Sequence, residues 1–153
     1  VDGEIAVRGP SVTPGYWGNS EATERAFRDG WFLTGDIGRF DADGYLYVLE
    51  RRDDLIVSGG ENVYPAEVEA ALMAHSAVED AGVTWVSDAR WGQVVVAVVK
   101  PRVGMSVSDE ELLAFCAERL ARYKLPRRIA FVEALPRNAA GKLLRRRLRE
   151  SLG

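Results

Sequence analysis

The sequence predicts an α+β fold in which a small sheet is covered by two or three helices. Strand-like alternation prevails up to Leu49, whereas helical and strand-like patterns are mixed after Pro65. Between them lies the stretch 50–65, ERRDDLIVSGGENVYP, in which a charged cluster, an apolar run, a glycine pair and a helix-opening proline follow one another closely. We call this stretch the joint and interpret it as the boundary between two parts of the chain.

Three strands and one short helix are predicted before the joint. The helix begins at a capping residue, Asn19 or Ser20, and ends at Phe27. The strands are Glu4–Arg8, Trp31–Leu33 and Tyr45–Leu49. The turn DADG at 41–44 belongs to a hairpin, and a calcium-binding EF-hand is excluded because the twelfth loop position, which requires a carboxylate, is Arg52.

Three helices and three strands are predicted after the joint. Pro65 suits the first turn of one helix, and Ser108 opens the capping box of a second helix, which ends at 124–126. The strands are Asp80–Val86, Gln93–Lys100 and Arg128–Glu133. A loop of small residues over 136–141 then leads into a basic third helix, 143–152. These elements predict a compact domain with a three-stranded sheet and covering helices.

Composition places the chain among ordinary globular proteins, with 47% hydrophobic and 28% charged residues. No apolar run is long enough to span a bilayer and the N-terminus lacks a signal-peptide pattern, so we expect a cytoplasmic protein without membrane contact. Cys116 and His75 are the only residues of their types, which excludes an internal disulfide, a cysteine-based metal cluster and a histidine-rich zinc site. We therefore predict no metal site, and we expect Cys116 in the core and His75 at a helix end.

The net charge of −3 hides an uneven distribution. From Arg119 onward 11 Lys/Arg stand against 2 Asp/Glu, a balance of +9, so residues 1–118 carry −12. A basic end on an acidic body indicates phosphate-bearing ligands, although a solvated cationic helix explains it equally well. Nucleic acid is not an expected partner, because the basic region has no interleaved aromatic residues and no zinc-finger spacing.

Two residues near the joint could bind a nucleotide. Asp36, flanked by glycines in TGDIG, could accept hydrogen bonds from the vicinal hydroxyls of a ribose, or it could be a turn aspartate bonded to its own backbone. Arg51 could reach a phosphate or ribose oxygen, or it could belong to a surface ion-pair cluster. The residues alone leave both alternatives open.

Two further groups could contact a ligand. Ser58, Gly59 and Gly60 allow a ligand to approach the backbone closely and present free N–H groups, although paired glycines are common in turns. Lys142, preceded by NAAG, lies on a loop that we expect to be mobile, where its cation could meet a developing negative charge. Most exposed lysines have no such role, so this position alone does not establish one.

The order of these motifs is more specific than any one of them. Over nearly its whole length the chain resembles the C-terminal part of the adenylate-forming acyl-CoA synthetases, in GEIAVRGP, GYW, GWFLTGDIG, DGYLYVLERRDDLIVSGGENVYPAEVE, YKLP and LPRNAAGKLLRR. Within that superfamily it looks most like the o-succinylbenzoate–CoA ligases of menaquinone biosynthesis, in RRDDLIVSGGENVYPAEVE, ARWGQV, FCAERLARYKLP and LPRNAAGKLLRR. Fatty-acid and aryl-acid CoA ligases share many of these sequence motifs, so they remain alternatives. The alternative outside the enzymes is a stand-alone, non-catalytic binding module.

The resemblance implies an ATP-dependent ligase with two half-reactions. A carboxylic acid and ATP form an acyl-adenylate with release of pyrophosphate, and the thiol of coenzyme A then displaces AMP. ATP, with Mg²⁺ in the full-length enzyme, and coenzyme A are the implied cofactors. Residues 1–52 would be the β-rich end of the large N-terminal domain, and residues 53–153 the mobile C-terminal domain, with its hinge at Asp53.

The same resemblance assigns a role to each candidate residue. Asp36 would hold the ribose hydroxyls and Arg51 the nucleotide. Lys142 would bridge the attacking carboxylate and the α-phosphate during adenylation, where a cation stabilises the transferring phosphoryl group. The segment 58–60 would line the channel for the pantetheine arm of coenzyme A in the second half-reaction.

The chain also departs from the family pattern. Glu50 stands where many relatives have glycine, and Trp85 stands where they usually have a small residue. Trp85 could pack on the core or widen an interface, and the sequence leaves both alternatives open. The phosphate loop and the acyl pocket of the family lie upstream of Val1, so we expect the fragment itself to be inactive in adenylation. The missing N-terminal domain of the same polypeptide is the implied partner. Strands within 1–49 that have lost their neighbours expose edges, which predicts a homo-oligomer.

Overall fold

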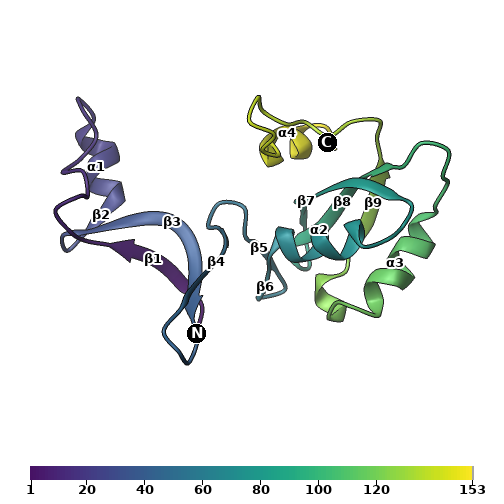
Figure 1. The fold of residues 1–153 in the computed structure, drawn as a ribbon, viewed down its shortest axis with the longest axis horizontal. Coiled ribbons are helices and arrows are strands. Elements are labelled where there is room, and N and C mark those ends of the chain that lie inside the picture. Colours follow the sequence, from purple (N-terminus) through teal and green to yellow (C-terminus); the bar gives the residue numbers. More distant parts are fainter. Residues whose placement is uncertain (153) are drawn as a thin grey trace. The chain divides into compact units, whose positions relative to one another are not determined.

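The computed structural model describes residues 1–152, which belong to two compact units. Unit 1 comprises Val1–Asp53, and unit 2 begins at Asp54 (Figure 1). Each unit combines a sheet with helical segments, so the predicted α+β class is confirmed. No helix within residues 1–152 is long and apolar enough to cross a membrane.

Unit 1 is a four-stranded antiparallel sheet with one short helix. β3 (Trp31–Phe40) pairs with β1 (Gly3–Val7), β2 (Phe27–Arg28) and β4 (Leu46–Arg51). α1 (Ser20–Ala26) precedes β2 and begins as predicted, because the Asn19 side chain accepts a hydrogen bond of 2.9 Å from the Ala22 N–H group. Large apolar side chains remain exposed on this unit, among them Trp17, Phe40 and Tyr45. Association between chains through these strands stays a prediction.

β3 extends to Phe40, well beyond the predicted strand end at Leu33. For the segment TGDIG that follows, a turn around Asp36 was one of the two alternatives left open. Gly38, however, lies within the sheet, where a Cβ atom would come within 2.8 Å of both Ile5 Cδ1 and the Tyr47 carbonyl oxygen. Glycine is therefore required here for the close packing of β1 and β4 on β3, rather than for a chain reversal.

Unit 2 is a five-stranded sheet with three α-helices within residues 54–152. The strands are β5 (Ile56–Ser58), β6 (Glu61–Val63), β7 (Val78–Asp88), β8 (Gly92–Pro101) and β9 (Arg128–Phe131). The helical segments are α2 (Pro65–Met73), α3 (Asp109–Ala117), the 3₁₀ helix η1 (Arg122–Lys124) and α4 (Arg145–Glu150). β8 pairs antiparallel with β5 and β7 and parallel with β9, and β5 pairs with β6.

The three predicted strands of this sheet are present with shifted ends, one hairpin was not predicted, and two helix boundaries differ from the prediction. The joint contains the hairpin β5–β6, whose three-residue strands are too short to show an alternating pattern. α3 ends at Ala117 rather than at 124–126, because Leu120 and Leu125 both pack against the main core. A continuous helix would place these two side chains about 140° apart around its axis. α4 begins at Arg145 rather than at 143.

The sheet of unit 2 is buried on both faces. α2 and α3 cover one face, where the main core includes Leu72, Ala97 and Cys116. The C-terminal segment covers the other face with a smaller core, formed by Val98, Leu135, Leu143 and Leu148. Val95, Ala97 and Val99 of β8 lie in the main core and Val98 lies in the smaller one. All six residues of its sequence VVVAVV are buried, which explains why the run is apolar throughout.

The buried thiol of Cys116 provides a test of this packing. The residue has 0% exposure, and burial raises the pKa of its thiol, so the thiol is both neutral and shielded. We expect the native chain to react with an aromatic disulfide reagent at least about 100-fold more slowly than the urea-unfolded chain. Spectrophotometric rates of thiol modification in the two states check this. Equal rates would contradict the packing of α3 on the sheet.

Candidate functional site

Asp36 and Arg51 are brought together by the sheet of unit 1. They are antiparallel partners on β3 and β4, and Arg51 Nε lies 3.1 Å from Asp36 Oδ1. Arg51 Nη1 also donates a hydrogen bond of 2.9 Å to the Thr34 carbonyl oxygen. Both side chains stay partly exposed, so the Asp36 carboxylate can accept further bonds beside a fixed guanidinium. This pair can bind the hydroxyl groups and the negative charge of a nucleotide.

Thr34 supports this pair and was not predicted from the sequence. Its hydroxyl oxygen accepts a hydrogen bond of 3.1 Å from the Asp36 N–H group and donates one of 3.0 Å to the Ile5 carbonyl oxygen. The backbone of Asp36 is thereby tied to β1. A threonine two residues before the aspartate was the available signal, since Ser/Thr hydroxyls bond nearby backbone groups.

Ser58, Gly59 and Gly60 form the turn of the hairpin β5–β6. The φ angles of Gly59 and Gly60 are 59° and 88°, values that L side chains rarely adopt. The Gly59 N–H group donates a hydrogen bond of 2.9 Å to the Trp91 carbonyl oxygen. A Cβ atom at Gly59 would lie 2.6 Å from Trp91 Cε3, whereas one at Gly60 would meet nothing within 4 Å. The first glycine thus accommodates the Trp91 ring, and the second leaves the turn open.

Two cations lie near the ring of Trp91, a feature that sequence reasoning missed. The guanidinium carbons of Arg90 and Arg127 lie 5.0 and 5.6 Å from its ring centroid. Asp88 holds the backbone at Arg90 and Trp91, because its carboxylate accepts 2.9 Å hydrogen bonds from the N–H groups of both residues. These hydrogen bonds lower the pKa of Asp88. An aromatic ring with two guanidinium groups beside a glycine turn can bind a phosphate and an aromatic base. The adjacent arginine and tryptophan in ARWGQV were the only sequence signal for this cluster.

Lys142 lies at the end of a tightly bonded turn, in contrast to the loose loop expected from its small residues. Asn138 Oδ1 accepts hydrogen bonds from the N–H groups of Ala140 and Lys142 at 3.0 and 2.8 Å. The Asn138 N–H group bonds the Lys142 carbonyl oxygen at 2.9 Å. Within residues 1–152 the Lys142 ammonium group has no hydrogen bond or ion pair, and the residue is exposed. The backbone is fixed while the cation remains available.

Several other predicted residues have structural surroundings. Asp53 is an exposed turn residue at the end of unit 1, and its hinge role stays a prediction. His75 Nδ1 accepts a hydrogen bond of 3.2 Å from the Ala77 N–H group, and the ring packs edge-on against Phe115, as a helix-end residue would. Trp85 packs against the main core with the Arg149 guanidinium 3.9 Å from its ring centroid. No group of three or more potential metal ligands lies within residues 1–152.

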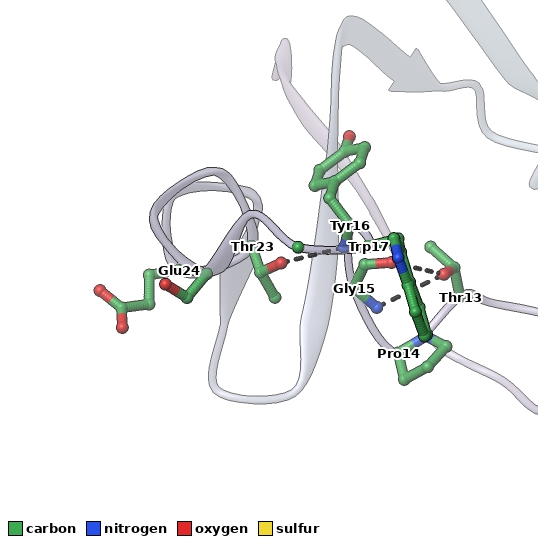
Figure 2. Close-up of a pocket in the computed structure, with 9 residues that line it drawn as sticks. Thr13, Pro14, Gly15, Tyr16, Trp17, Thr23 and Glu24 are labelled. Atoms are coloured by element: carbon green, nitrogen blue, oxygen red, sulfur yellow. Dashed lines mark hydrogen bonds between the residues drawn. The ribbon is translucent and has the colours of Figure 1, made fainter.

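A pocket in unit 1 contains none of the predicted site residues (Figure 2). It is lined by the segment from Thr13 to Gly18 and by the first turn of α1. Its two threonine hydroxyl groups are occupied internally: Thr13 Oγ1 donates to the Gly15 carbonyl oxygen at 2.9 Å, and Thr23 Oγ1 accepts from the Tyr16 N–H group and donates to the Asn19 carbonyl oxygen, each at 2.9 Å. We therefore assign the pocket a structural role in holding the loop before α1.

Comparisons with known proteins agree with the motif order. The AMP-binding enzyme C-terminal domain family matches residues 67–142. A 2-succinylbenzoate–CoA ligase from Geobacillus kaustophilus is 63% identical over 147 residues, which cover 96% of this chain and 30% of that protein. The solved o-succinylbenzoate CoA synthetase from Bacillus subtilis, in complex with the acyl-adenylate intermediate OSB-AMP, is 49% identical with a TM-score of 0.89 over 97% of this chain and 30% of that chain.

A solved fatty acyl CoA synthetase from Mycobacterium tuberculosis is also similar. It is 44% identical with a TM-score of 0.70, over 98% of this chain and 30% of that chain. The chain thus spans about 30% of the length of the relatives that it matches.

Proposed function

Because the chain belongs to the AMP-binding enzymes and contains their C-terminal domain, we propose that it is part of an ATP-dependent acid–thiol ligase. The observation that carries the proposal is the high identity to 2-succinylbenzoate–CoA ligases over almost all of the chain. The proposed reaction joins a carboxylic acid to coenzyme A through an acyl-adenylate. The chemistry of the described residues divides between the two half-reactions.

The first half-reaction uses three side chains of this chain. Asp36 accepts hydrogen bonds from the ribose hydroxyls of ATP, while Arg51, held against Asp36 and the Thr34 carbonyl group, adds positive charge beside the nucleotide. The Lys142 ammonium group lies between the attacking carboxylate and the α-phosphate. It stabilises negative charge that develops as the phosphoryl group is transferred. Residues 1–152 contain no ligand cluster that fits Mg²⁺.

The second half-reaction uses the turn of Ser58, Gly59 and Gly60. The pantetheine arm of coenzyme A passes this turn on the open side of Gly60, where the absence of a side chain lets the thiol approach the backbone. The Trp91 ring with its two flanking guanidinium groups contributes an aromatic face and positive charge near the same turn. We propose that rotation about Asp53 exchanges the two arrangements, with residues 1–52 belonging to the large domain and 53–153 to the mobile one. The reaction is proposed to take place in the cytosol, where ATP and coenzyme A are available.

We propose o-succinylbenzoate as the acid, which places the reaction in menaquinone biosynthesis. The test is an assay of the full-length protein with o-succinylbenzoate and a panel of fatty and aryl acids, following thioester formation. Preference for o-succinylbenzoate in kcat/KM is the expected result. Preference for a fatty or another aryl acid would replace the substrate while leaving the ligase assignment in place.

The 153-residue chain alone is expected to form no acyl-adenylate. It holds Asp36, Arg51 and Lys142 but spans about 30% of the length of its relatives, so we expect the remaining contacts to the triphosphate and the acid to be absent. ATP–pyrophosphate exchange with o-succinylbenzoate checks this, with the full-length protein as the positive control. Exchange by the short chain above a no-enzyme blank would contradict the prediction.

A further inference from the structure

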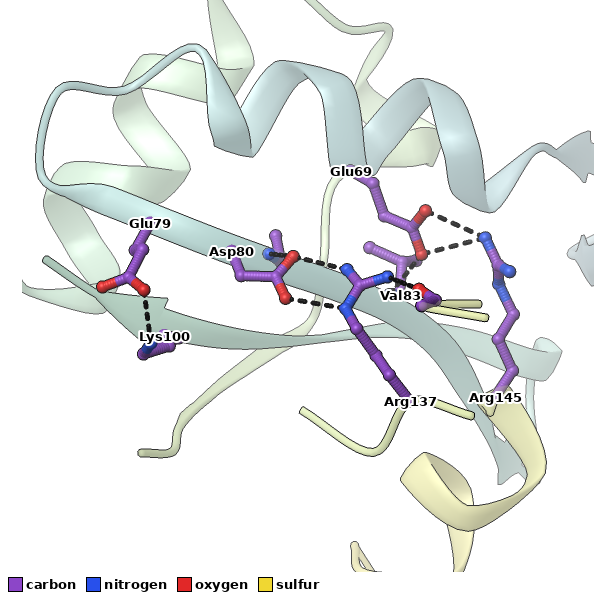
Figure 3. Close-up of polar contacts among 9 residues, drawn as sticks. Glu69, Glu79, Asp80, Val83, Lys100, Arg137 and Arg145 are labelled. Atoms are coloured by element: carbon purple, nitrogen blue, oxygen red, sulfur yellow. Dashed lines mark hydrogen bonds and ion pairs between the residues drawn. The ribbon is translucent and has the colours of Figure 1, made fainter. Parts of the chain in front are cut away.

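The ion pair between Arg137 and Asp80 connects the turn 138–142, which ends at Lys142, to the sheet of unit 2 (Figure 3). Arg137 Nε and Nη2 donate to the two carboxylate oxygens of Asp80 on β7, at 3.0 and 2.7 Å. The third nitrogen, Nη1, donates a hydrogen bond of 2.7 Å to the Gly141 carbonyl oxygen. A single planar guanidinium group therefore links a sheet strand to the residue immediately before Lys142. Lysine could not make this three-point contact in the same plane.

The chain on both sides of the turn is anchored by burial. Leu135 and Leu143 lie in the smaller core, and Arg137 forms a β-bridge with Leu143. Gly82 of β7 makes room for them, because a Cβ atom there would lie 2.7 Å from Leu135 and 3.0 Å from Leu143. These contacts fix the base of the turn. Its tip, which includes Ala140 and Lys142, is exposed and depends on polar contacts.

Two neighbouring ion pairs do not hold the turn 138–142. Glu79 pairs with Lys100 across β7 and β8, and neither residue has an ion pair or side-chain hydrogen bond with the turn. Glu69 pairs with Arg145 and thereby holds the start of α4, after the turn has ended. Within residues 1–152, Arg137 is the cation with a hydrogen bond to the backbone of the segment 138–142. The Asp80 hydrogen bonds also raise the pKa of Arg137, as expected for a tightly held charge pair.

From this geometry we infer that Arg137 and Asp80 are positioning residues for Lys142 during adenylation. The inference rests on the proposed function. We call the Arg137–Asp80 ion pair the clamp. It holds the Gly141 carbonyl group and so fixes the point from which the Lys142 side chain extends. Electrostatic stabilisation depends on a charge that is already in place, and a displacement of about 1 Å at a reacting centre can cost roughly 100-fold in rate.

The kinetic test compares Arg137→Gln and Asp80→Asn with the wild type in the full-length protein. Each variant is expected to lower kcat for acyl-adenylate formation by roughly 10- to 100-fold, with little change in KM for ATP. CoA attack on a supplied acyl-adenylate is expected to stay within about twofold of the wild type, because Lys142 acts in the first half-reaction. Arg137→Lys, which keeps the charge but not the three contacts, should recover only part of the rate.

Glu79→Gln is the matched control, since it removes an ion pair from the same strand without touching the turn. Its adenylation rate should equal that of the wild type. Equal losses in both half-reactions for Arg137→Gln would indicate general destabilisation and overturn the inference, as would an unchanged adenylation rate. If the wild-type protein forms no acyl-adenylate from any acid, the proposed function fails instead.

A second measurement does not depend on activity. In the 153-residue chain, amide hydrogen exchange at Ala140 and Lys142 should become at least roughly tenfold faster in Arg137→Gln, while exchange in β8 is unchanged. Their N–H groups donate to Asn138 Oδ1, so their protection reports the closed turn directly. Unchanged exchange at these two amides would show that the clamp does not hold the turn, whatever the enzyme does.

Discussion

Replacing Lys142 with alanine in the full-length protein is expected to lower acyl-adenylate formation by about 10²- to 10³-fold. The reason is the loss of a cation that no other group replaces at this turn, because Lys142 has a fixed backbone and an ammonium group without partners among residues 1–152. Folding should be unaffected, since the side chain is exposed. ATP–pyrophosphate exchange measures the first half-reaction, and thioester formation from a supplied acyl-adenylate measures the second, which should stay within about twofold of the wild type.

Arg146→Ala is the matched control for this prediction. Arg146 is an exposed cation four positions further along, paired with Glu150 on α4, and its side chain is 90% exposed. Its removal changes the net charge by the same amount, so a purely long-range electrostatic effect would slow both variants alike. Equal loss of both half-reactions in Lys142→Ala would contradict the role assigned to the lysine in adenylation.

The parts of the fold that the sequence predicts are those with local signals. Asn19 and Ser108 begin helices at the expected positions because their side chains cap the first turn. The strand β8 follows from its apolar run VVVAVV, and β7 was also expected, over the shorter span Asp80–Val86. The hairpin β5–β6 escapes prediction because its three-residue strands are too short to show an alternating pattern. The end of α3 escapes prediction because packing determines it: Leu120 and Leu125 must both reach the main core.

The candidate site shows the same division. Asp36 and Arg51 could be named from motifs, and the structure places them as strand partners. The Arg137–Asp80 clamp could not be named, since its partners are 57 positions apart and nothing in either residue's neighbourhood indicates the other. Trp91 was hidden for a related reason: it meets Gly59 through the pairing of β5 with β8, although the two are far apart in sequence. Contacts that depend on sheet pairing require the structure.

Gly59→Ala is expected to destabilise unit 2 and to impair the thioester half-reaction more than Gly60→Ala does. Both glycines have positive φ, so either substitution strains the backbone by about 1–2 kcal/mol. Only at Gly59 does the new Cβ atom collide with Trp91, at 2.6 Å, so the ring must move as well. We expect a total loss of about 2–4 kcal/mol in the free energy of unfolding at Gly59, measured by urea denaturation of the 153-residue chain.

The collision can be separated from the strain with a double-mutant cycle in which Trp91→Ala removes the ring. If Trp91 causes the excess cost, Gly59→Ala in the Trp91→Ala background should cost no more than Gly60→Ala does in the wild type. In the full-length protein, Gly59→Ala should raise KM for coenzyme A and slow thioester formation, while adenylation continues, because the turn is proposed to serve the second half-reaction alone. A loss confined to adenylation would place the turn in the first half-reaction and remove it from the coenzyme A path.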